Sequence, residues 1–166
     1  MAELSQLLEA NKAYAATYAH GDAEARPRRR LAVVTCMDTR IDVLAALGLR
    51  IGDAHILRNV GGRVTDDVLR SLALSTHVLG VNTLVVMQHT KCGLAGVTDD
   101  ELRSLTGAEL RFLPINDHTV TLREDVDLVA ATSFLTPLDA VAGFVYDVEN
   151  GGVEEVVRWE RPANSG

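Results

Sequence analysis

The chain is short of cysteine, of positive charge and of long apolar runs, and each shortage excludes a class of protein. With two cysteines among 166 residues, a disulfide is not the default expectation and a metal site with four thiolates is excluded. The 16 basic and 23 acidic residues give a formal charge of −7, which does not favour nucleic-acid binding. The longest apolar stretches, such as Leu84–Met87, are too short to span a bilayer. We therefore expect neither a nucleic acid nor a membrane as a partner.

The start of the chain, MAELSQLLEANKAYAATY, lacks the basic leader and continuous apolar stretch of a secretory signal, so a cytoplasmic protein is expected. Its leucines and tyrosines recur at helical spacing, which predicts an amphipathic helical arm over residues 1–19. The arginine-rich connection over residues 20–30 is interpreted as a solvated linker rather than an anion-binding patch, because the whole chain is acidic. There is no internal repeat, and residues 1–166 are predicted to form a single domain.

Short, near-continuous apolar runs alternate with helical patterns through the first two thirds of the chain. The predicted strands are Leu31–Cys36, Ala54–Arg58, Thr83–Gln88, Gly143–Val148 and Val153–Val157, and the predicted helices are Ile41–Leu47, 66–79, Asp99–Leu105 and Thr121–Thr132. Apolar strands without alternation indicate burial on both faces, which is typical of parallel sheets. We predict an α/β fold: a central, mostly parallel β-sheet flanked by helices, with a late antiparallel strand and an N-terminal helical arm.

Three side chains that bind metals fall at one edge of this predicted sheet. Cys36 ends the first strand, His89 directly follows the third, and Cys92 completes a His-x-x-Cys turn. Each residue alone can be explained without a metal, since a cysteine that ends a strand is often a small buried hydrophobic side chain. Together they form a Cys2His set that suits Zn²⁺ and leaves a fourth tetrahedral position open. Zinc with an open position lowers the pKa of a bound water from about 16 toward about 7. One Zn²⁺ per subunit is therefore predicted.

Asp38 and Arg40 follow the first cysteine on the same loop. They are either a surface ion pair, which contributes little, or functional neighbours of the metal. In the functional reading, Arg40 keeps Asp38 ionised and oriented, and Asp38 accepts a hydrogen bond from zinc-bound hydroxide so that the hydroxide is aimed at an electrophile.

Three segments, CMDTR at 36–40, RNVGG at 58–62 and HTKCG at 89–93, together resemble the β-class carbonic anhydrases, most of all the short bacterial and archaeal members. The family pattern is Cys-x-Asp-x-Arg, an Arg-Asn-x-Gly-like segment and His-x-x-Cys-Gly, in that order. The resemblance implies that Cys36, His89 and Cys92 are zinc ligands and that Asp38 and Arg40 form a catalytic dyad. It assigns a supporting role to Arg58, Asn59 and Gly61. Gly93, directly after the last ligand, is expected to support the site by letting the backbone turn at the metal.

The resemblance implies reversible hydration of carbon dioxide to bicarbonate and a proton, catalysed by a carbonate dehydratase that is built as a homodimer or a tetramer. Two alternatives stay open: a carbon disulfide or carbonyl sulfide hydrolase of the same fold, and a non-catalytic zinc-binding protein. Within residues 107–120 no pocket residue of the family has a clear counterpart. His118 in this segment is interpreted as a solvent-exposed loop histidine, with a proton shuttle as the alternative.

Overall fold

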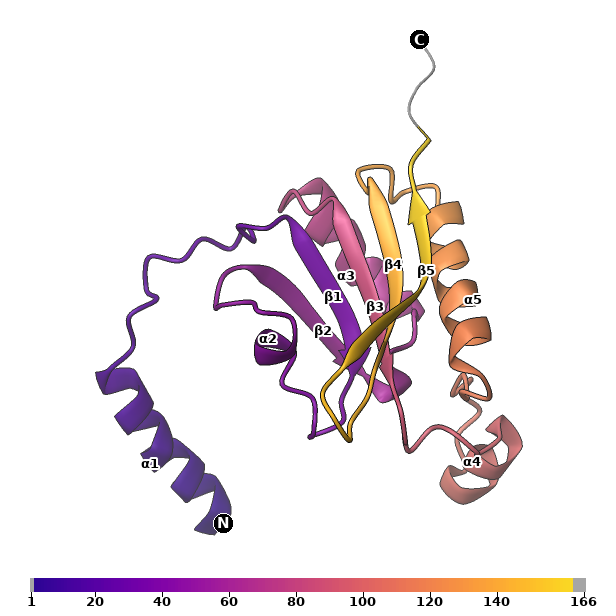
Figure 1. Cartoon of the computed structure of the whole chain (residues 1–166). Helices are drawn as coiled ribbons and strands as arrows, with labels where there is room; N and C mark the ends of the chain where they lie inside the picture. Colours follow the sequence, from indigo (N-terminus) through magenta and orange to yellow (C-terminus); the bar gives the residue numbers. More distant parts are fainter. Residues whose placement is uncertain (1, 163–166) are drawn as a thin grey trace.

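The computed structural model describes residues 2–162 as a five-stranded sheet in the order β2-β1-β3-β4-β5, with helices on both faces (Figure 1). The strands are β1 (Leu31–Cys36), β2 (Ala54–Asn59), β3 (Thr83–His89), β4 (Ala140–Tyr146) and β5 (Val153–Glu160). The helices are α1 (Ala2–Ala16), α2 (Val43–Ala46), α3 (Asp66–His77), α4 (Asp99–Thr106) and α5 (His118–Ala131), and η1 (Val60–Gly62) is a short 3-10 turn. The first four strands pair in parallel and β5 runs antiparallel to β4, so the predicted fold class is confirmed.

Two apolar cores lie on opposite faces of the sheet. On one face, α3 and α5 pack against the strands, and Val34 and Val86 are fully buried there. On the other face, α2 and the segment that follows β3 cover Val33 and Met87. Successive residues of one strand therefore enter different cores, which explains why the central strands are apolar without alternation.

Two elements begin earlier than the sequence predicts. Helix α5 starts at His118 because Asp117 caps it: the Asp117 carboxylate accepts a hydrogen bond from the backbone N–H of Val120 at 3.0 Å. Strand β4 starts at Ala140, where it pairs with the beginning of β3, and it ends before Asp147, which belongs to the turn into β5. Both differences follow from contacts of single side chains or strand neighbours, which apolar patterning does not encode.

Of the two other helices near the site, α3 begins where the sequence predicts and α2 does not. Thr65 caps α3 and accepts from the backbone N–H of Val68 at 3.4 Å, as predicted. Helix α2 is shorter than predicted because its cap is Asp42, which accepts from the N–H of Ala45 at 3.1 Å.

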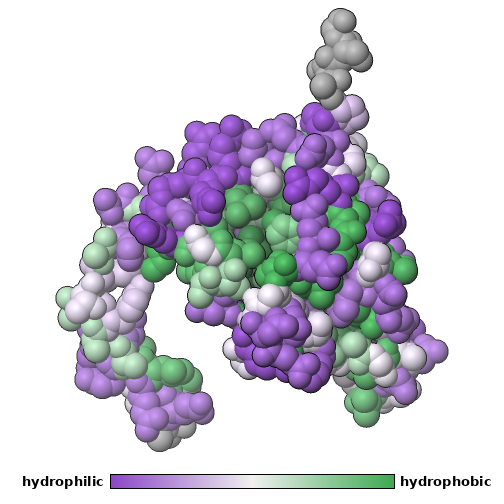
Figure 2. Space-filling model, viewed as in Figure 1, coloured by the Kyte–Doolittle hydropathy of each residue, from purple (hydrophilic) through white to green (hydrophobic). Residues whose placement is uncertain are grey.

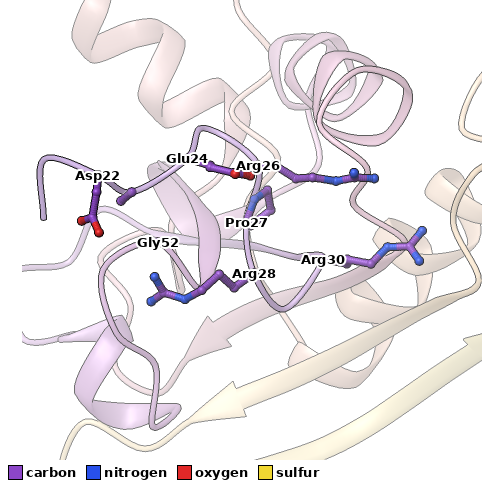
Figure 3. Close-up of a pocket in the computed structure, with 8 residues that line it drawn as sticks. Asp22, Glu24, Arg26, Pro27, Arg28, Arg30 and Gly52 are labelled. Atoms are coloured by element: carbon purple, nitrogen blue, oxygen red, sulfur yellow. The ribbon is translucent and has the colours of Figure 1, made fainter.

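The linker of residues 20–30 lines a surface pocket of about 480 Å³ (Figure 3). Arg28 and Arg30 point in opposite directions in this view. Arg28 donates to the carboxylate of Asp53 at 3.0 Å, and Arg30 donates to the backbone carbonyl of Gly80 at 2.9 Å. These arginines fasten the linker to the body of the protein, which agrees with its interpretation as a connection.

Helix α1 stands apart from the sheet at the end of this linker (Figure 1). Its leucines are exposed: Leu4 by 68%, Leu7 by 62% and Leu8 by 70%. Within residues 2–162, no helix combines the length and apolar character that a membrane crossing requires.

Candidate metal centre

The three predicted ligands meet at the carboxyl edge of the sheet. Cys36 is the last residue of β1 and His89 the last of β3, and these two strands are neighbours. Cys92 returns toward them from the turn after β3. The ligand atoms of these three buried residues lie within 4.8 Å of one another, and no other such group of three occurs among residues 2–162. The Sγ atoms of Cys36 and Cys92 are 4.0 Å apart, close to the separation of about 3.8 Å that two thiolates adopt on tetrahedral zinc.

The imidazole of His89 is oriented as a metal ligand. Its Nδ1 lies 2.9 Å from the carbonyl oxygen of Thr90, and because a carbonyl only accepts, Nδ1 carries the proton. The other nitrogen, Nε2, is buried and has no hydrogen-bond partner in the described part of the chain. A buried imidazole nitrogen with a free lone pair, facing two thiols, fits a zinc ion.

The two thiols are strongly coupled. The hydrogen bond with Cys92 lowers the pKa of Cys36, while the same contact and burial raise the pKa of Cys92. Acting on each other alone, the two cysteines therefore share one proton. A thiolate is the form that binds a metal, and the lowered pKa of Cys36 favours that form.

Asp38 and Arg40 are held together beside this cluster. The Oδ1 atom of Asp38 accepts from the backbone N–H and the Nε of Arg40, each at 2.9 Å, and Oδ2 accepts from Nη2 at 2.7 Å. These bonds hold the pKa of the Asp38 carboxyl well below its usual range. Oδ2 also lies 3.8 Å from Nε2 of His89, so the ionised carboxylate faces the ligand cluster.

Arg58 and Asn59 support the loop that carries this pair. The guanidinium of Arg58 bonds three carbonyl oxygens of the loop after β1, at 3.0, 2.6 and 3.3 Å: those of Cys36, Asp38 and Ile41. The side chain of Asn59 bonds both the backbone N–H and the carbonyl of Arg63, which closes the η1 turn. These contacts hold the backbone of the loop after β1 and of the η1 turn.

Two glycines in η1 allow the chain to pass close to the ligands. Gly61 has a φ of 75°, and a Cβ there would lie 2.6 Å from a methyl of Leu94. Gly62 has a φ of 64°, and a Cβ there would lie 2.8 Å from the carbonyl oxygen of Met87 and 2.9 Å from the backbone nitrogen of Cys36. Because backbone atoms cannot move aside cheaply, Gly62 is the more restricted position, although sequence reasoning singled out Gly61.

The turn between His89 and Cys92 is made differently from expectation. A Cβ at Gly93 would meet nothing within 4 Å, and nothing in the structure explains a supporting role for this glycine. The residue with positive φ is Lys91, at 53°. Its carbonyl oxygen accepts a hydrogen bond from Arg40 Nη2 at 3.1 Å.

The interpretation of His118 as a solvent-exposed loop histidine is wrong. It is the first residue of α5, half-buried, and its Nδ1 lies 2.9 Å from Oε1 of the buried Gln88, which also accepts from Thr121 Oγ1. Burial lowers the pKa of His118, with a smaller contribution from His89. The proton-shuttle alternative stays untested.

Sequence reasoning missed a buried ion pair near the site. Arg63 donates to both carboxylate oxygens of Asp125, at 2.7 and 3.3 Å, and to the backbone carbonyls of Leu113 and Pro114. It joins η1 to α5 and to the segment before α5. The two residues are far apart in the sequence, and no motif marks them.

A buried Cys-His-Cys cluster with a held carboxylate, on the carboxyl edge of a mostly parallel sheet, defines an α/β protein built around a metal centre. The family model described as carbonic anhydrase matches residues 31–125, more than half of the chain. The chain is 38% identical over 136 residues to β-carbonic anhydrase 1 of Mycobacterium tuberculosis, covering 78% of this chain and 83% of that protein.

Two further comparisons agree with this match. A carbon disulfide hydrolase of Acidithiobacillus thiooxidans is 37% identical, with 89% of this chain and 84% of that protein covered. The crystal structure of a carbonic anhydrase from Streptococcus mutans superposes with a TM-score of 0.83 at 40% identity, covering 95% of this chain and 99% of that one. The chain belongs to the β-carbonic anhydrase family, and it is an enzyme of the lyase type.

Proposed function

We propose that this enzyme catalyses the reversible hydration of carbon dioxide to bicarbonate and a proton, with one Zn²⁺ per subunit held by Cys36, His89 and Cys92. The observation that carries the proposal is the position of Asp38. Its Oδ2 atom lies 3.8 Å from the free Nε2 of His89, while both carboxylate oxygens are bound by Arg40. A purely structural zinc site has no use for an ionised carboxylate held at its open side.

Each part of the site has a separate task. Held by Cys36, His89 and Cys92, a zinc ion would supply Lewis acidity, which would make a water molecule acidic enough to act as a nucleophile near neutral pH. Asp38 accepts a hydrogen bond from the attacking oxygen and so aims its lone pair at the carbon of CO₂. Arg40 keeps Asp38 ionised and in place. Leu94 and Ile115 belong to the same apolar cluster as the two cysteines, which suits a small apolar substrate.

Stopped-flow CO₂ hydration by the zinc-loaded protein tests the proposal. We expect Asp38→Ala to bind zinc like the wild type but to lose most of its kcat/KM, and Cys36→Ser to lose zinc as well as activity. If the zinc-loaded wild type hydrates CO₂ no faster than Asp38→Ala, the proposed CO₂ hydration fails, and hydrolysis of a sulfur analogue or a non-catalytic zinc-binding protein is left.

A second candidate is the hydrolysis of carbon disulfide or carbonyl sulfide. It is favoured by the relative named carbon disulfide hydrolase, which aligns with 89% of this chain at 37% identity. The same three ligands and the same carboxylate serve this chemistry, so access to the pocket decides between the substrates. Hydrogen sulfide release from either sulfur compound, compared with CO₂ hydration by the same preparation, separates the two functions.

We propose a homodimer, with a tetramer as the alternative. An isolated helix of this length is marginal in water, yet the leucines of α1 face solvent. Figure 2 shows hydrophobic surface at the centre of the visible face, between the arm and the β4–β5 strands. A second copy offers α1 such a surface. Light scattering at micromolar concentration is expected to give the mass of a dimer for the wild type. Replacing Leu4, Leu7 and Leu8 by serine should give a smaller mass. A monomeric wild type would contradict the proposal.

We also propose that residues 1–166 act as one domain. A location in the cytoplasm is proposed because Cys36 and Cys92 are free thiols that must stay reduced to bind a metal. Cell fractionation followed by zinc analysis of the recovered protein tests this location.

A further inference from the structure

Two consecutive carbonyl groups in the loop between His89 and Cys92 hold two different parts of the site. The carbonyl oxygen of Thr90 accepts from His89 Nδ1 at 2.9 Å, and that of Lys91 accepts from Arg40 Nη2 at 3.1 Å. The first contact orients a zinc ligand, and the second holds the guanidinium that binds Asp38. The path of this loop therefore sets the position of the ligand relative to the dyad.

This backbone path is unfavourable for the loop alone, so contacts with other segments must hold it. Lys91 has a φ of 53°, in the left-handed region where a side chain is disfavoured. Residues in such conformations persist when the surrounding structure holds them. The question is which contacts hold this one.

Thr90 makes those contacts with the end of β4 and the turn that follows. Its backbone N–H donates to the carbonyl of Tyr146 at 2.9 Å. Its hydroxyl oxygen accepts from the backbone N–H of Val148 at 3.1 Å and donates to Asp147 Oδ1 at 3.4 Å. Asp147 is itself fixed, because its carboxylate also accepts from the backbone N–H of Glu149 at 2.8 Å. One residue thus joins the loop to three consecutive positions of the hairpin.

A second link between the same segments is much weaker. Lys91 Nζ lies 2.6 Å from Glu149 Oε1, but the two side chains are 60% and 65% exposed. Ion pairs exposed to this degree are screened by water and contribute little. The hydroxyl of Thr90 is therefore the side-chain contact that matters for the loop.

We propose that Thr90 is a positioning residue: through its hydroxyl bonds to the 147–148 turn, it fixes the loop that orients both the zinc ligand His89 and the dyad residue Arg40. The inference rests on the proposed zinc-dependent function and deepens it. Thr90 touches neither the metal nor the substrate, so its effect is transmitted through the two carbonyls.

The test measures zinc affinity by competition with a chromophoric chelator, and the visible absorption spectrum of the Co²⁺-substituted protein. Thr90→Val keeps nearly the same side-chain shape but replaces the hydroxyl by a methyl next to the Val148 N–H. Thr90→Ala also lacks the hydroxyl and places no methyl there. We expect both variants to bind zinc 10- to 100-fold more weakly, the usual effect of losing a group that orients a metal ligand, and to change the Co²⁺ spectrum. Thr90→Ser should restore both properties, and Glu149→Gln should leave both at wild-type values.

Wild-type zinc affinity and Co²⁺ spectra in both Thr90→Val and Thr90→Ala would overturn the inference, even if their melting temperatures fall. A loss of affinity that Thr90→Ser does not restore would also overturn it. An inactive zinc-loaded wild type would instead refute the proposed function, while the affinity series would still decide the role of Thr90. A wild type that binds neither ion would refute both.

Discussion

The most informative stability experiment concerns the ion pair between Arg63 and Asp125. The exposed fractions of the two side chains are 6% and 3%, and the guanidinium reaches both carboxylate oxygens. Glu124, the preceding residue of α5, also approaches Arg63, at 3.4 Å, but its side chain is 63% exposed. Replacing either acid by alanine removes one carboxylate from the same helix, next to the same arginine.

The two replacements should differ severalfold in cost. Asp125→Ala leaves the Arg63 charge buried without its main partner, and breaking a buried pair in this way costs about 3–5 kcal/mol. Glu124→Ala removes an exposed partner, which is worth about 0–1 kcal/mol. For a domain of this size each kcal/mol moves the melting temperature by about 2–4 °C, so Asp125→Ala should melt about 6–20 °C lower and Glu124→Ala within about 4 °C of the wild type.

The pKa of Asp125 shows where this cost comes from. Burial raises the pKa of its carboxyl, although Arg63 opposes the shift. Asp125→Ala removes the carboxylate and leaves the buried Arg63 guanidinium without this partner, so the unpaired charge contributes to the loss. The double variant Arg63→Met with Asp125→Ala should therefore lose less than the sum of the two single variants.

Thermal unfolding followed by circular dichroism, at fixed protein and zinc concentrations, measures these differences. Equal melting temperatures for the Asp125→Ala and Glu124→Ala variants would refute the reasoning, because they would mean that burial does not set the strength of this pair. Strict additivity in the double variant would refute the role of the stranded charge.

Three further predictions follow from the geometry near the site. Gly62→Ala should lower the free energy of unfolding by more than about 2 kcal/mol, because a left-handed φ and close contacts with backbone atoms coincide there. Gly93→Ala should leave the free energy of unfolding, measured in denaturant titrations, within about 0.5 kcal/mol of the wild type. A Gly62→Ala variant as stable as the wild type would contradict the close approach. Thr98→Ala removes the capping box with Glu101 and should destabilise α4 by about 1 kcal/mol. The amide hydrogens of α4 should then exchange faster with solvent. Unchanged exchange would argue against the cap. Zinc affinity should rise about tenfold per pH unit above neutral pH. The reason is the raised pKa of Cys92: the proton shared by the two thiols must leave when the metal binds. An affinity that does not change with pH in competition titrations would be inconsistent with a protonated thiol.

Local pattern was sufficient to find the three candidate metal ligands. Cys36 and His89 end strands that are mostly apolar, and such strands lie side by side with their carboxyl ends at one edge. The spacing between His89 and Cys92 brings the third ligand back within one turn. The fold class and the ligand cluster could therefore be predicted, since strand burial and turn length are short-range properties of the chain.

The amino-acid sequence by itself thus determined the strands, the edge at which they end and the candidate ligands at those ends, because each strand or turn has a local pattern. The contact of Cys36 with His89 and Cys92 also required the pairing of β1 with β3. Only the tertiary structure decided how those residues are held. The hydrogen bond between Thr90 and Asp147 and the ion pair between Arg63 and Asp125 join segments about 60 residues apart, and Lys91 lies in a left-handed conformation next to the first of these contacts. Such contacts leave no periodicity in the sequence, because each depends on which side chains the packed helices and strands bring face to face.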